Sequence, residues 1–366
     1  MKFSIPREDL LPALQTVTGV VERRQTLPIL SNLLLSIDKE SISLTTTDME
    51  VELVAIIKKK LSEKSEATLP ARKLLDICRT LPDEAVLNLE INGDKALLTS
   101  GKSRFTLATL PPQEFPTTDL SGNTWEFRIS EERFKSLLDR TAFAMAQQDV
   151  RYYLNGLLLE LNKGVLRAVA TDGHRLALCE LEVDNTQDQA AQIIVPRKAV
   201  TELVRLLREE DEEISIQISG NHIHIDLGDL RFTSKLIDGK FPDYERVIPG
   251  IGKFPVTANK DALRQSLTRA SILSNEKYRG VRIILDKGRL RALAHNPEQE
   301  EAEEEIDVQY DGDDLEIGFN VSYLLDALGI IKTDQVQLSI SDPNSSCLIL
   351  PPGSSECKYV VMPMRL

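Results

Sequence analysis

Three short clusters in this sequence combine residue types that could carry out chemistry. Asp172 and His174 flank a glycine, and a carboxylate beside an imidazole can do acid–base work. His222 and His224 would share one face of a strand, as two ligands of a metal ion can. The stretch 311–314, DGDD, offers carboxylate oxygens to a cation. Each cluster is therefore a candidate reactive or metal-binding site.

None of the three clusters is complete. The pair around Asp172 lacks a matched nucleophile, and no third ligand lies near the two histidines in the sequence. The DGDD stretch lacks the spacing and the downstream glutamate of an EF-hand loop, and the chain contains no P-loop. A surface strand is the simpler interpretation of 222–224. We therefore expect no catalysis, no cofactor and no metal.

The stretch that contains Asp172 belongs to a pattern that occurs three times. An apolar strand with a polar stop ends at Asp48, at Asp172 and at Asn296, 124 residues apart in both steps. A fixed period over a whole chain indicates a repeated domain. The 366 residues therefore predict three tandem domains, 1–123, 124–250 and 251–366.

The elements of each repeat can be predicted from the same comparison. Each repeat opens with a helix that has apolar residues four apart: Leu10 and Leu14, Phe134 and Leu138, Leu263 and Leu267. A strand follows at Asn32, Gly156 and Gly280 and pairs with the strand that ends at the polar stop. A second helix begins near Pro70, Pro196 and Asn320, and two more strands close the unit. The prediction is an α+β fold, with two helices on one face of an antiparallel sheet in each repeat.

Composition and cysteine usage suggest a cytoplasmic protein. The chain is 42% hydrophobic and 28% charged, as soluble globular proteins are. Its apolar runs fall short of the roughly 20 residues that span a bilayer, and its first residues do not resemble a signal peptide. The cysteines are dispersed, with no CxxC spacing: Cys78, Cys179, Cys347 and Cys357. We expect them to be reduced, mostly buried thiols.

Charge is distributed unevenly along the chain. The net charge of −13 argues mildly against nucleic acid as a partner. However, the segment 298–307 carries seven acidic residues and no basic one. The predicted helical segments 196–208 and 72–79 carry four and three basic residues against one acidic residue each. These runs are either solvated faces or a segregation of positive helices from an acidic exterior.

Several longer stretches closely resemble the bacterial DNA polymerase III β subunits, the sliding clamps. They are TLPILSNLLL (26–35), QDVRYYLNG (148–156), ATDGHRLAL (170–178), FTSKLIDGKFPDYERV (232–247), SNEKYRGVR (274–282), NPEQEEAEE (296–304) and YVVMPMRL (359–366). The resemblance implies three equivalent domains per subunit and a head-to-tail homodimer that closes into a ring around duplex DNA. Twelve helices with axes about 8–10 Å apart would leave an opening of about 25 Å between backbones.

The implied function is that of a sliding clamp, a non-catalytic processivity factor of a replicative polymerase. It would hold double-stranded DNA without reading its sequence, through residues that contact phosphates. The resemblance assigns this role to Arg24, Arg72, Gln148, Tyr152, Tyr153, Arg197 and Lys198. The alternative for the two tyrosines is a place in the core. Many family members have a histidine where this chain has Gln147, although an amide can still bond a phosphate.

Ring closure needs two different surfaces that fit one another. For the first repeat the candidates are Lys73, Lys102, Arg104, Phe105 and Leu107. For the third repeat they are Ile272, Leu273, Glu298, Glu300, Glu303 and Glu304. Apolar packing would supply affinity and opposite charges would set orientation. The alternative for the glutamate run is a solvated loop.

The resemblance also implies a groove for short apolar peptides at the junction of the second and third repeats. Its partners would be the polymerase α subunit, the clamp loader, other DNA polymerases and repair proteins. The corresponding residues are Leu154, Thr171, Gly173, His174, Arg175, Leu176, Pro242, Arg246, Val247, Tyr278, Asn320, Tyr323, Ser346, Met362, Pro363, Met364, Arg365 and Leu366. Without the resemblance, Met362 and Met364 would be assigned to the core. The competing function is a monomeric interaction scaffold that does not encircle DNA.

Overall fold

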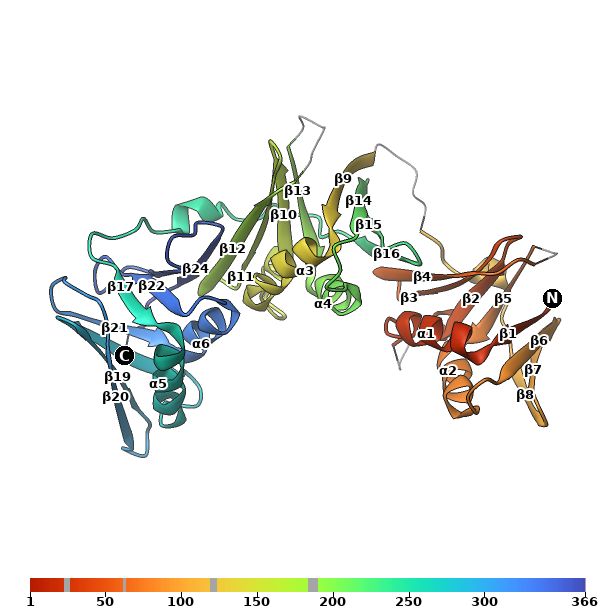
Figure 1. Cartoon of the computed structure of the whole chain (residues 1–366), viewed down its shortest axis with the longest axis horizontal. Helices are drawn as coiled ribbons and strands as arrows, with labels where there is room; N and C mark the ends of the chain where they lie inside the picture. Colours follow the sequence, from red (N-terminus) through yellow and green to blue (C-terminus); the bar gives the residue numbers. More distant parts are fainter. Residues whose placement is uncertain (23–26, 62–63, 119–123, 184–189, 366) are drawn as a thin grey trace. The chain divides into compact units, whose positions relative to one another are not determined.

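The chain folds into two compact units. A computed structural model describes residues 1–22, 27–61, 64–118, 124–183 and 190–365 (Figure 1). Unit 1 contains Met1–Arg133 and Thr201–Leu236, and unit 2 contains Phe134–Val200 and Ile237–Leu366. The division between the units therefore falls inside the predicted middle repeat.

Unit 1 consists of two antiparallel sheets with the helices of the first repeat. The smaller sheet has the order β1-β6-β7-β8, and the larger has the order β5-β2-β3-β4-β16-β15-β14-β9. The elements are β1 (Lys2–Pro6), α1 (Arg7–Val17), η1 (Pro28–Ser31), β2 (Asn32–Ile37), β3 (Ser41–Thr47), β4 (Val51–Lys58), β5 (Ser65–Pro70), α2 (Ala71–Thr80), β6 (Val86–Asn92), β7 (Lys95–Ser100), β8 (Ser103–Ala108), η2 (Pro112–Glu114), β9 (Thr124–Ser130), β14 (Glu213–Ser219), β15 (His222–Asp226) and β16 (Leu230–Lys235). Two further helices, α3 (Glu131–Asp139) and α4 (Arg197–Leu206), cross the division between the units.

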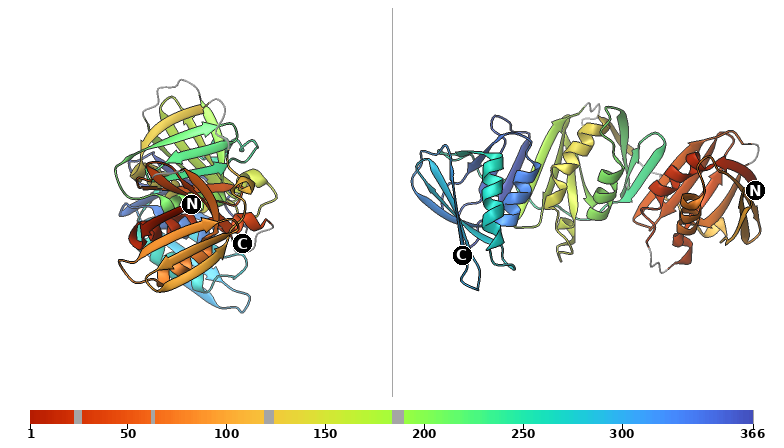
Figure 2. Two further views of the ribbon diagram at one scale, coloured as in Figure 1. Left: turned by 90° about the vertical axis from the view of Figure 1, so that its right-hand side faces the viewer. Right: turned by 60° about the horizontal axis from the view of Figure 1, so that its bottom comes forward.

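Unit 2 repeats this plan. Its sheets have the orders β13-β10-β11-β12-β24-β23-β22-β17 and β20-β19-β18-β21. Helices α5 and α6 pack against one another, and α5 also packs on β20 (Figure 2). The elements are η3 (Ala142–Ala144), η4 (Tyr152–Leu154), β10 (Gly156–Asn162), β11 (Val165–Thr171), β12 (Arg175–Glu182), β13 (Ala191–Pro196), η5 (Tyr244–Val247), β17 (Val256–Asn259), α5 (Lys260–Ile272), β18 (Gly280–Asp286), β19 (Arg289–His295), β20 (Glu301–Asp307), β21 (Leu315–Asn320), α6 (Val321–Ile330), β22 (Gln335–Ser339), β23 (Cys347–Leu350) and β24 (Cys357–Val361).

The predicted repeat elements form where the sequence pattern places them. Strands β2, β10 and β18 begin at Asn32, Gly156 and Gly280, and their partners β3, β11 and β19 end one residue before each polar stop. The apolar residues at helical spacing, such as Leu10 and Leu14 of α1, are buried. The α+β repeat was therefore predicted correctly at the level of these elements.

The number of strands was underestimated. The sequence predicts four strands in each repeat, but the structure has eight in each predicted domain: β1–β8, β9–β16 and β17–β24. Half of the middle set completes a sheet with the first repeat through β4 and β16, and the other half pairs with the third through β12 and β24. Strand partners so distant in sequence produce no local hairpin signal.

The prediction of four reduced thiols was wrong for two of them. Cys179 of β12 and Cys357 of β24 lie directly opposite one another and form a disulfide, at a sequence separation of 178. Cys78 and Cys347 are buried and free. Sequence spacing could not reveal the bridge, because the two cysteines meet only through the pairing of strands from different repeats.

Among the described residues, no helix has both the length and the apolar character needed to span a membrane. The longest, α5, has 13 residues.

Candidate partner-binding site

The turn from Thr171 to Arg175 lies at the centre of the predicted groove. The Thr171 hydroxyl donates to the Arg175 carbonyl at 2.6 Å, and Gly173 has a φ of 87°, which favours glycine. The amides of His174 and Arg175 donate to one Asp172 oxygen at 2.9 and 3.0 Å. Asp172 therefore closes the turn, and this arrangement gives no support to acid–base catalysis.

The Arg175 side chain connects this turn to α6. Its guanidinium donates to the other Asp172 oxygen and to the Phe143 carbonyl, both at 3.0 Å, and it bonds Asp326. The Tyr323 ring centroid lies 4.6 Å from the guanidinium carbon, on α6. Sequence reasoning missed Asp326 and Phe143, since neither belongs to a motif. Arg175 therefore joins elements of the second and third repeats.

The C-terminal segment forms another side of the site. The Met362 amide donates to the His174 carbonyl at 2.9 Å, and the Met364 amide donates to the Gly318 carbonyl at 2.8 Å. Both methionine side chains are half-buried, so the core alternative for them does not hold. The exposed His174 ring stacks toward Tyr323, with centroids 6.5 Å apart.

A third side comes from the segment 237–248. Phe241 and Tyr244 are buried in one apolar cluster with Leu176 and Val360, whereas neighbouring predicted residues of the segment are exposed. Those exposed residues are Pro242, Arg246 and Val247. Leu154 is buried at the end of η4, and Ser346 is half-buried just before β23. Leu366 lies outside the described residues.

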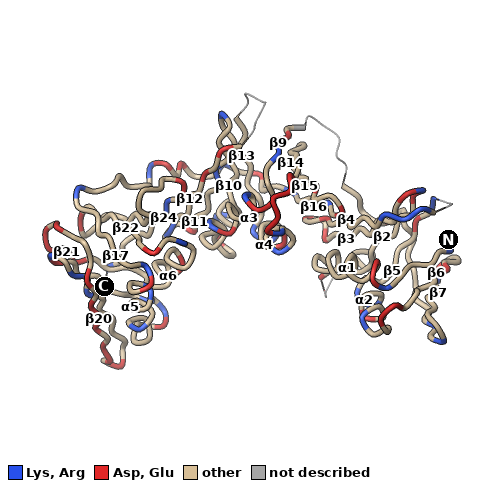
Figure 3. The backbone as a smooth tube through the Cα atoms, viewed as in Figure 1, with Lys and Arg blue, Asp and Glu red and all other residues tan. Residues whose placement is uncertain are grey.

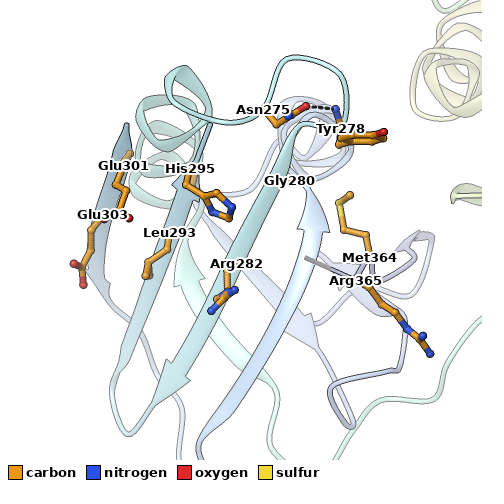
Figure 4. A pocket seen from close by; sticks show the side chains of 12 residues that line it. Asn275, Tyr278, Gly280, Arg282, Leu293, His295, Glu301, Glu303, Met364 and Arg365 are labelled. Atoms are coloured by element: carbon orange, nitrogen blue, oxygen red, sulfur yellow. Dashed lines mark hydrogen bonds between the residues drawn. The ribbon is translucent and has the colours of Figure 1, made fainter. Parts of the chain in front are cut away.

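A cavity of about 620 Å³ lies on the sheet of β18, β19 and β20 (Figure 4). Three predicted groove residues line it, namely Tyr278, Met364 and Arg365. The Asn320 amide donates to the Tyr278 carbonyl at 3.3 Å. The rest of the lining was not predicted for the groove: Asn275, Gly280, Arg282, Leu293, Ala294, His295, Glu301, Ala302 and Glu303. The pairing of β18, β19 and β20 brings all of these residues except Asn275 together.

Most residues predicted to contact DNA lie in unit 2. Tyr152 is 57% exposed, which argues against a core role for it, whereas Tyr153 is partly buried against the apolar cluster. Arg197 begins α4, and its guanidinium donates to the Met145 carbonyl at 2.7 Å. Gln148 is exposed and Lys198 is half-exposed.

Two further residues, Arg72 and Arg24, were predicted to contact DNA. Arg72 lies on α2 in unit 1, exposed, and its guanidinium bonds the Val21 carbonyl. Arg24 lies outside the described residues. In the third repeat the two helices differ in charge, because α6 contains one aspartate and no lysine or arginine, whereas α5 contains one lysine and two arginines against one aspartate.

Four of the five first-repeat candidates for the subunit interface lie on or directly before an edge strand of unit 1. Strand β8 is the last strand of the smaller sheet and pairs there with β7. Lys102 and Arg104 are exposed, Phe105 is half-buried and Leu107 is buried. Lys73 is exposed on α2.

The acidic candidates lie on and before an edge strand of unit 2. Residues 301–307 form β20, which is largely acidic (Figure 3), so the solvated-loop alternative is wrong for them. Glu298 and Glu300 are exposed in the preceding turn. Glu304 accepts from Arg269 of α5 at 2.8 Å, and this bond lowers the pKa of its carboxyl. Glu303 lies 3.5 Å from Arg291. Ile272, the last residue of α5, is 73% exposed, and Leu273, which follows it, is half-buried.

The two histidines considered as metal ligands lie on β15, as the strand interpretation predicted. His224 Nδ1 lies 2.9 Å from the Thr233 hydroxyl, and burial lowers the pKa of this imidazole to about 4. Within the described ranges, no group of three or more His, Cys, Asp or Glu side chains is placed to hold a metal ion. His224 is therefore a neutral side chain of the sheet.

Comparisons with known proteins cover the whole chain. Models of the DNA polymerase III beta subunit match residues 1–119 (N-terminal domain), 128–243 (central domain) and 245–365 (C-terminal domain). The beta sliding clamp of Pseudomonas aeruginosa is 54% identical over 100% of both chains. The crystal structure of the DNA polymerase III subunit beta from that organism has a TM-score of 0.97, with 54% identity and 100% coverage of both chains. A structure of a P. aeruginosa sliding clamp bound to griselimycin, at the same identity and coverage, has a TM-score of 0.96.

Proposed function

This chain belongs to the DNA polymerase III beta subunit family, and from that premise we propose that two copies close head-to-tail into a ring around duplex DNA. Each copy contributes three domains, 1–123, 124–250 and 251–366. The ring acts as the processivity factor of a replicative polymerase in the bacterial cytoplasm and catalyses no reaction itself. The observation that carries the proposal is the pair of oppositely charged edge strands, β8 and β20.

Pairing of edge strands from the two copies forms the subunit interfaces of the ring. An edge strand presents backbone N–H and C=O groups that a further strand can bond. Pairing β8 of one copy with β20 of a second would extend both sheets and cover the exposed Ile272. Because the two surfaces differ, each copy offers one of each, and two such contacts can close a ring.

Electrostatics favours the pairing of β8 with β20 over the pairing of β8 with β8 or of β20 with β20. Strand β8 and its flank carry Lys102 and Arg104, whereas β20 carries Glu301, Glu303 and Glu305 on its exposed positions. Two β8 edges would repel one another, and so would two β20 edges. Only the mixed pair is attractive, so electrostatics specifies the head-to-tail arrangement.

A closed ring stays on DNA because it surrounds the duplex, so it does not need to bind the DNA tightly. Basic side chains such as Arg72, Arg197 and Lys198 contact phosphates, which carry no sequence information, so the ring can slide. Gln148, Tyr152 and Tyr153 add polar contacts from unit 2. The overall charge of −13 repels DNA from other faces.

The groove around His174, Val247, Tyr323 and Met362 receives short apolar peptides of partner proteins. These partners are the polymerase α subunit, the clamp loader, other DNA polymerases and repair proteins. Methionine adapts to differently shaped ligands, so one groove can serve several of them. The griselimycin complex of the P. aeruginosa sliding clamp supports a ligand site in this family, and we propose that the same compound binds this groove.

A topological assay tests the ring. Labelled protein is loaded on a nicked circular plasmid with a bacterial clamp loader and ATP, then isolated in salt high enough to screen phosphate contacts. Cutting the plasmid once should release the protein through the free ends, while mock digestion should leave it bound. Retention on linear DNA, or sedimentation of the free protein as a 41.0 kDa monomer, would favour the non-encircling scaffold instead.

A further inference from the structure

We propose that Arg167 and Tyr244 are positioning residues for the partner-binding groove. They hold the segment 241–248, one wall of the groove, on the sheet beneath it. The inference rests on the proposed function, because it assumes that the groove binds partner peptides. Neither residue is among those that the sequence predicted for the groove.

A charged row across three strands anchors the segment. Glu160 of β10, Arg167 of β11 and Glu180 of β12 lie directly opposite one another in the antiparallel register. The Arg167 guanidinium donates to Glu180 at 3.0 Å and to the Tyr244 hydroxyl oxygen at 2.9 Å. The Tyr244 hydroxyl donates in turn to Glu160 at 3.1 Å, and Glu245 lies 3.4 Å from Arg167. The segment is thus tied to the sheet by two consecutive residues.

The anchor is shielded from water, so its hydrogen bonds are not readily exchanged for solvent. The side chains of Glu160 and Arg167 are 12% and 25% exposed, and Tyr244 is buried. Burial raises the pKa of the Tyr244 hydroxyl, which keeps its proton at neutral pH. Burial alone would lower the pKa of Arg167, but its bonds to Tyr244 and Glu180 outweigh that effect and raise it. The hydroxyl therefore accepts from a cation and donates to a carboxylate at once.

The same sheet face leads from the anchor to the groove. Next to the charged row, two residues away on each of the three strands, lies an apolar row formed by Leu158, Val169 and Leu178. This row packs in one apolar cluster with Phe241 and Tyr244. Two residues further lie Thr171 and Leu176, which are groove residues, so anchor and groove are about 13 Å apart along the strand.

The anchored residue and the wall belong to one short element. Tyr244 begins the single turn η5 and Val247 ends it. Fixing the Tyr244 ring on the apolar row and its hydroxyl on the charged row therefore fixes where Val247 lies. The anchor thus sets the wall of the groove without touching the ligand.

The test removes the hydroxyl and keeps the ring. In Tyr244→Phe, we expect the dissociation constant for griselimycin, measured by calorimetry, to rise about three- to tenfold, because the wall becomes mobile. Glu160→Gln should weaken binding in the same direction. Tyr310→Phe is the matched control, since its hydroxyl donates to the Asp313 carbonyl at 2.6 Å, outside the groove, and its affinity should equal that of the wild type.

The binding measurements test the groove and the positioning role separately. If the wild type does not bind griselimycin, the proposed groove is wrong, whatever the variants do. If it binds and Tyr244→Phe binds within twofold of it, the positioning role is refuted, even if the thermal midpoint falls. Should Tyr244→Phe fail to fold, Glu160→Gln decides between the same two outcomes.

Discussion

At the residue scale, the surroundings of a side chain decide its role more than its neighbours in sequence do. Asp172 beside His174 suggests acid–base chemistry, yet its oxygens accept two backbone amides and the Arg175 guanidinium. The corresponding Asp48 likewise accepts the amides of Glu50 and Val51, at 2.9 and 2.7 Å. The polar stop that revealed the repeat is therefore a turn-closing residue.

His224 provides a prediction about pH at this scale. The folded chain holds the pKa of His224 at about 4, down from 6.5, mainly through burial. Between these values the unfolded chain binds more protons, so stability falls as the pH falls from 6.5 to about 4 and is fully retained above 6.5. The loss is at most about 3 kcal/mol.

Thermal unfolding over this pH range checks the prediction. The midpoint of the wild type should fall more steeply with acidification than that of His224→Asn. His295→Asn, which replaces an exposed histidine of β19, should follow the wild type. Parallel curves for His224→Asn and the wild type would contradict the assigned role of His224.

At the element scale, strand pairing between repeats determines the local chemistry. Strands β12 and β24 come from different repeats, and their register brings Cys179 opposite Cys357 at one end. At the other end, the same pair places Arg175 opposite Val361, next to Met362. The disulfide and the candidate groove are thus built on the same two strands.

The disulfide predicts a thiol count. Protein purified without reductant and then denatured should titrate two thiols, those of Cys78 and Cys347, and four after reduction. Removing the crosslink in Cys179→Ser should lower the free energy of unfolding by about 2–4 kcal/mol, because the bridge closes a long loop in the unfolded chain. After reduction, wild type and Cys179→Ser should unfold together. Four reactive thiols before reduction would show that the bridge does not form.

At the scale of the whole molecule, edge charges should control assembly. Reversing the charge of β8 and its flank in Lys102→Glu/Arg104→Glu places acidic strands opposite β20 in both contacts of a homodimer. Reversing β20 in Glu301→Lys/Glu303→Lys has the converse effect. Each variant alone should dimerise at least about tenfold more weakly, as measured by analytical sedimentation.

Mixing the two variants distinguishes head-to-tail pairing from other arrangements. In a mixed ring, reversed β8 meets reversed β20 and unchanged β8 meets unchanged β20, so both contacts are again attractive. A one-to-one mixture should therefore recover the dimer. Independent monomers in the mixture would contradict the assignment of these two strands as partners, while persistent dimers of either variant would show that their charges do not control assembly.

The sequence by itself determined the threefold repeat, the α+β class and the principal helices and strands. These depend on local signals, namely residue period, turn residues and a spacing of 124 that recurs at Asp48, Asp172 and Asn296. Resemblance then identified the family, which the comparisons confirm. The predicted roles of individual groove, DNA-contact and interface residues remain proposals.

Only the tertiary structure decided how strands from different repeats combine. The pairing of β4 with β16 and of β12 with β24 joins segments more than 170 residues apart, and no local pattern specifies such a partner. That pairing creates the Cys179–Cys357 bridge and joins the elements that carry Arg175 and Asp326. The physical reason is that propensity and periodicity act within a few residues, whereas burial and hydrogen bonding between distant strands depend on the folded chain.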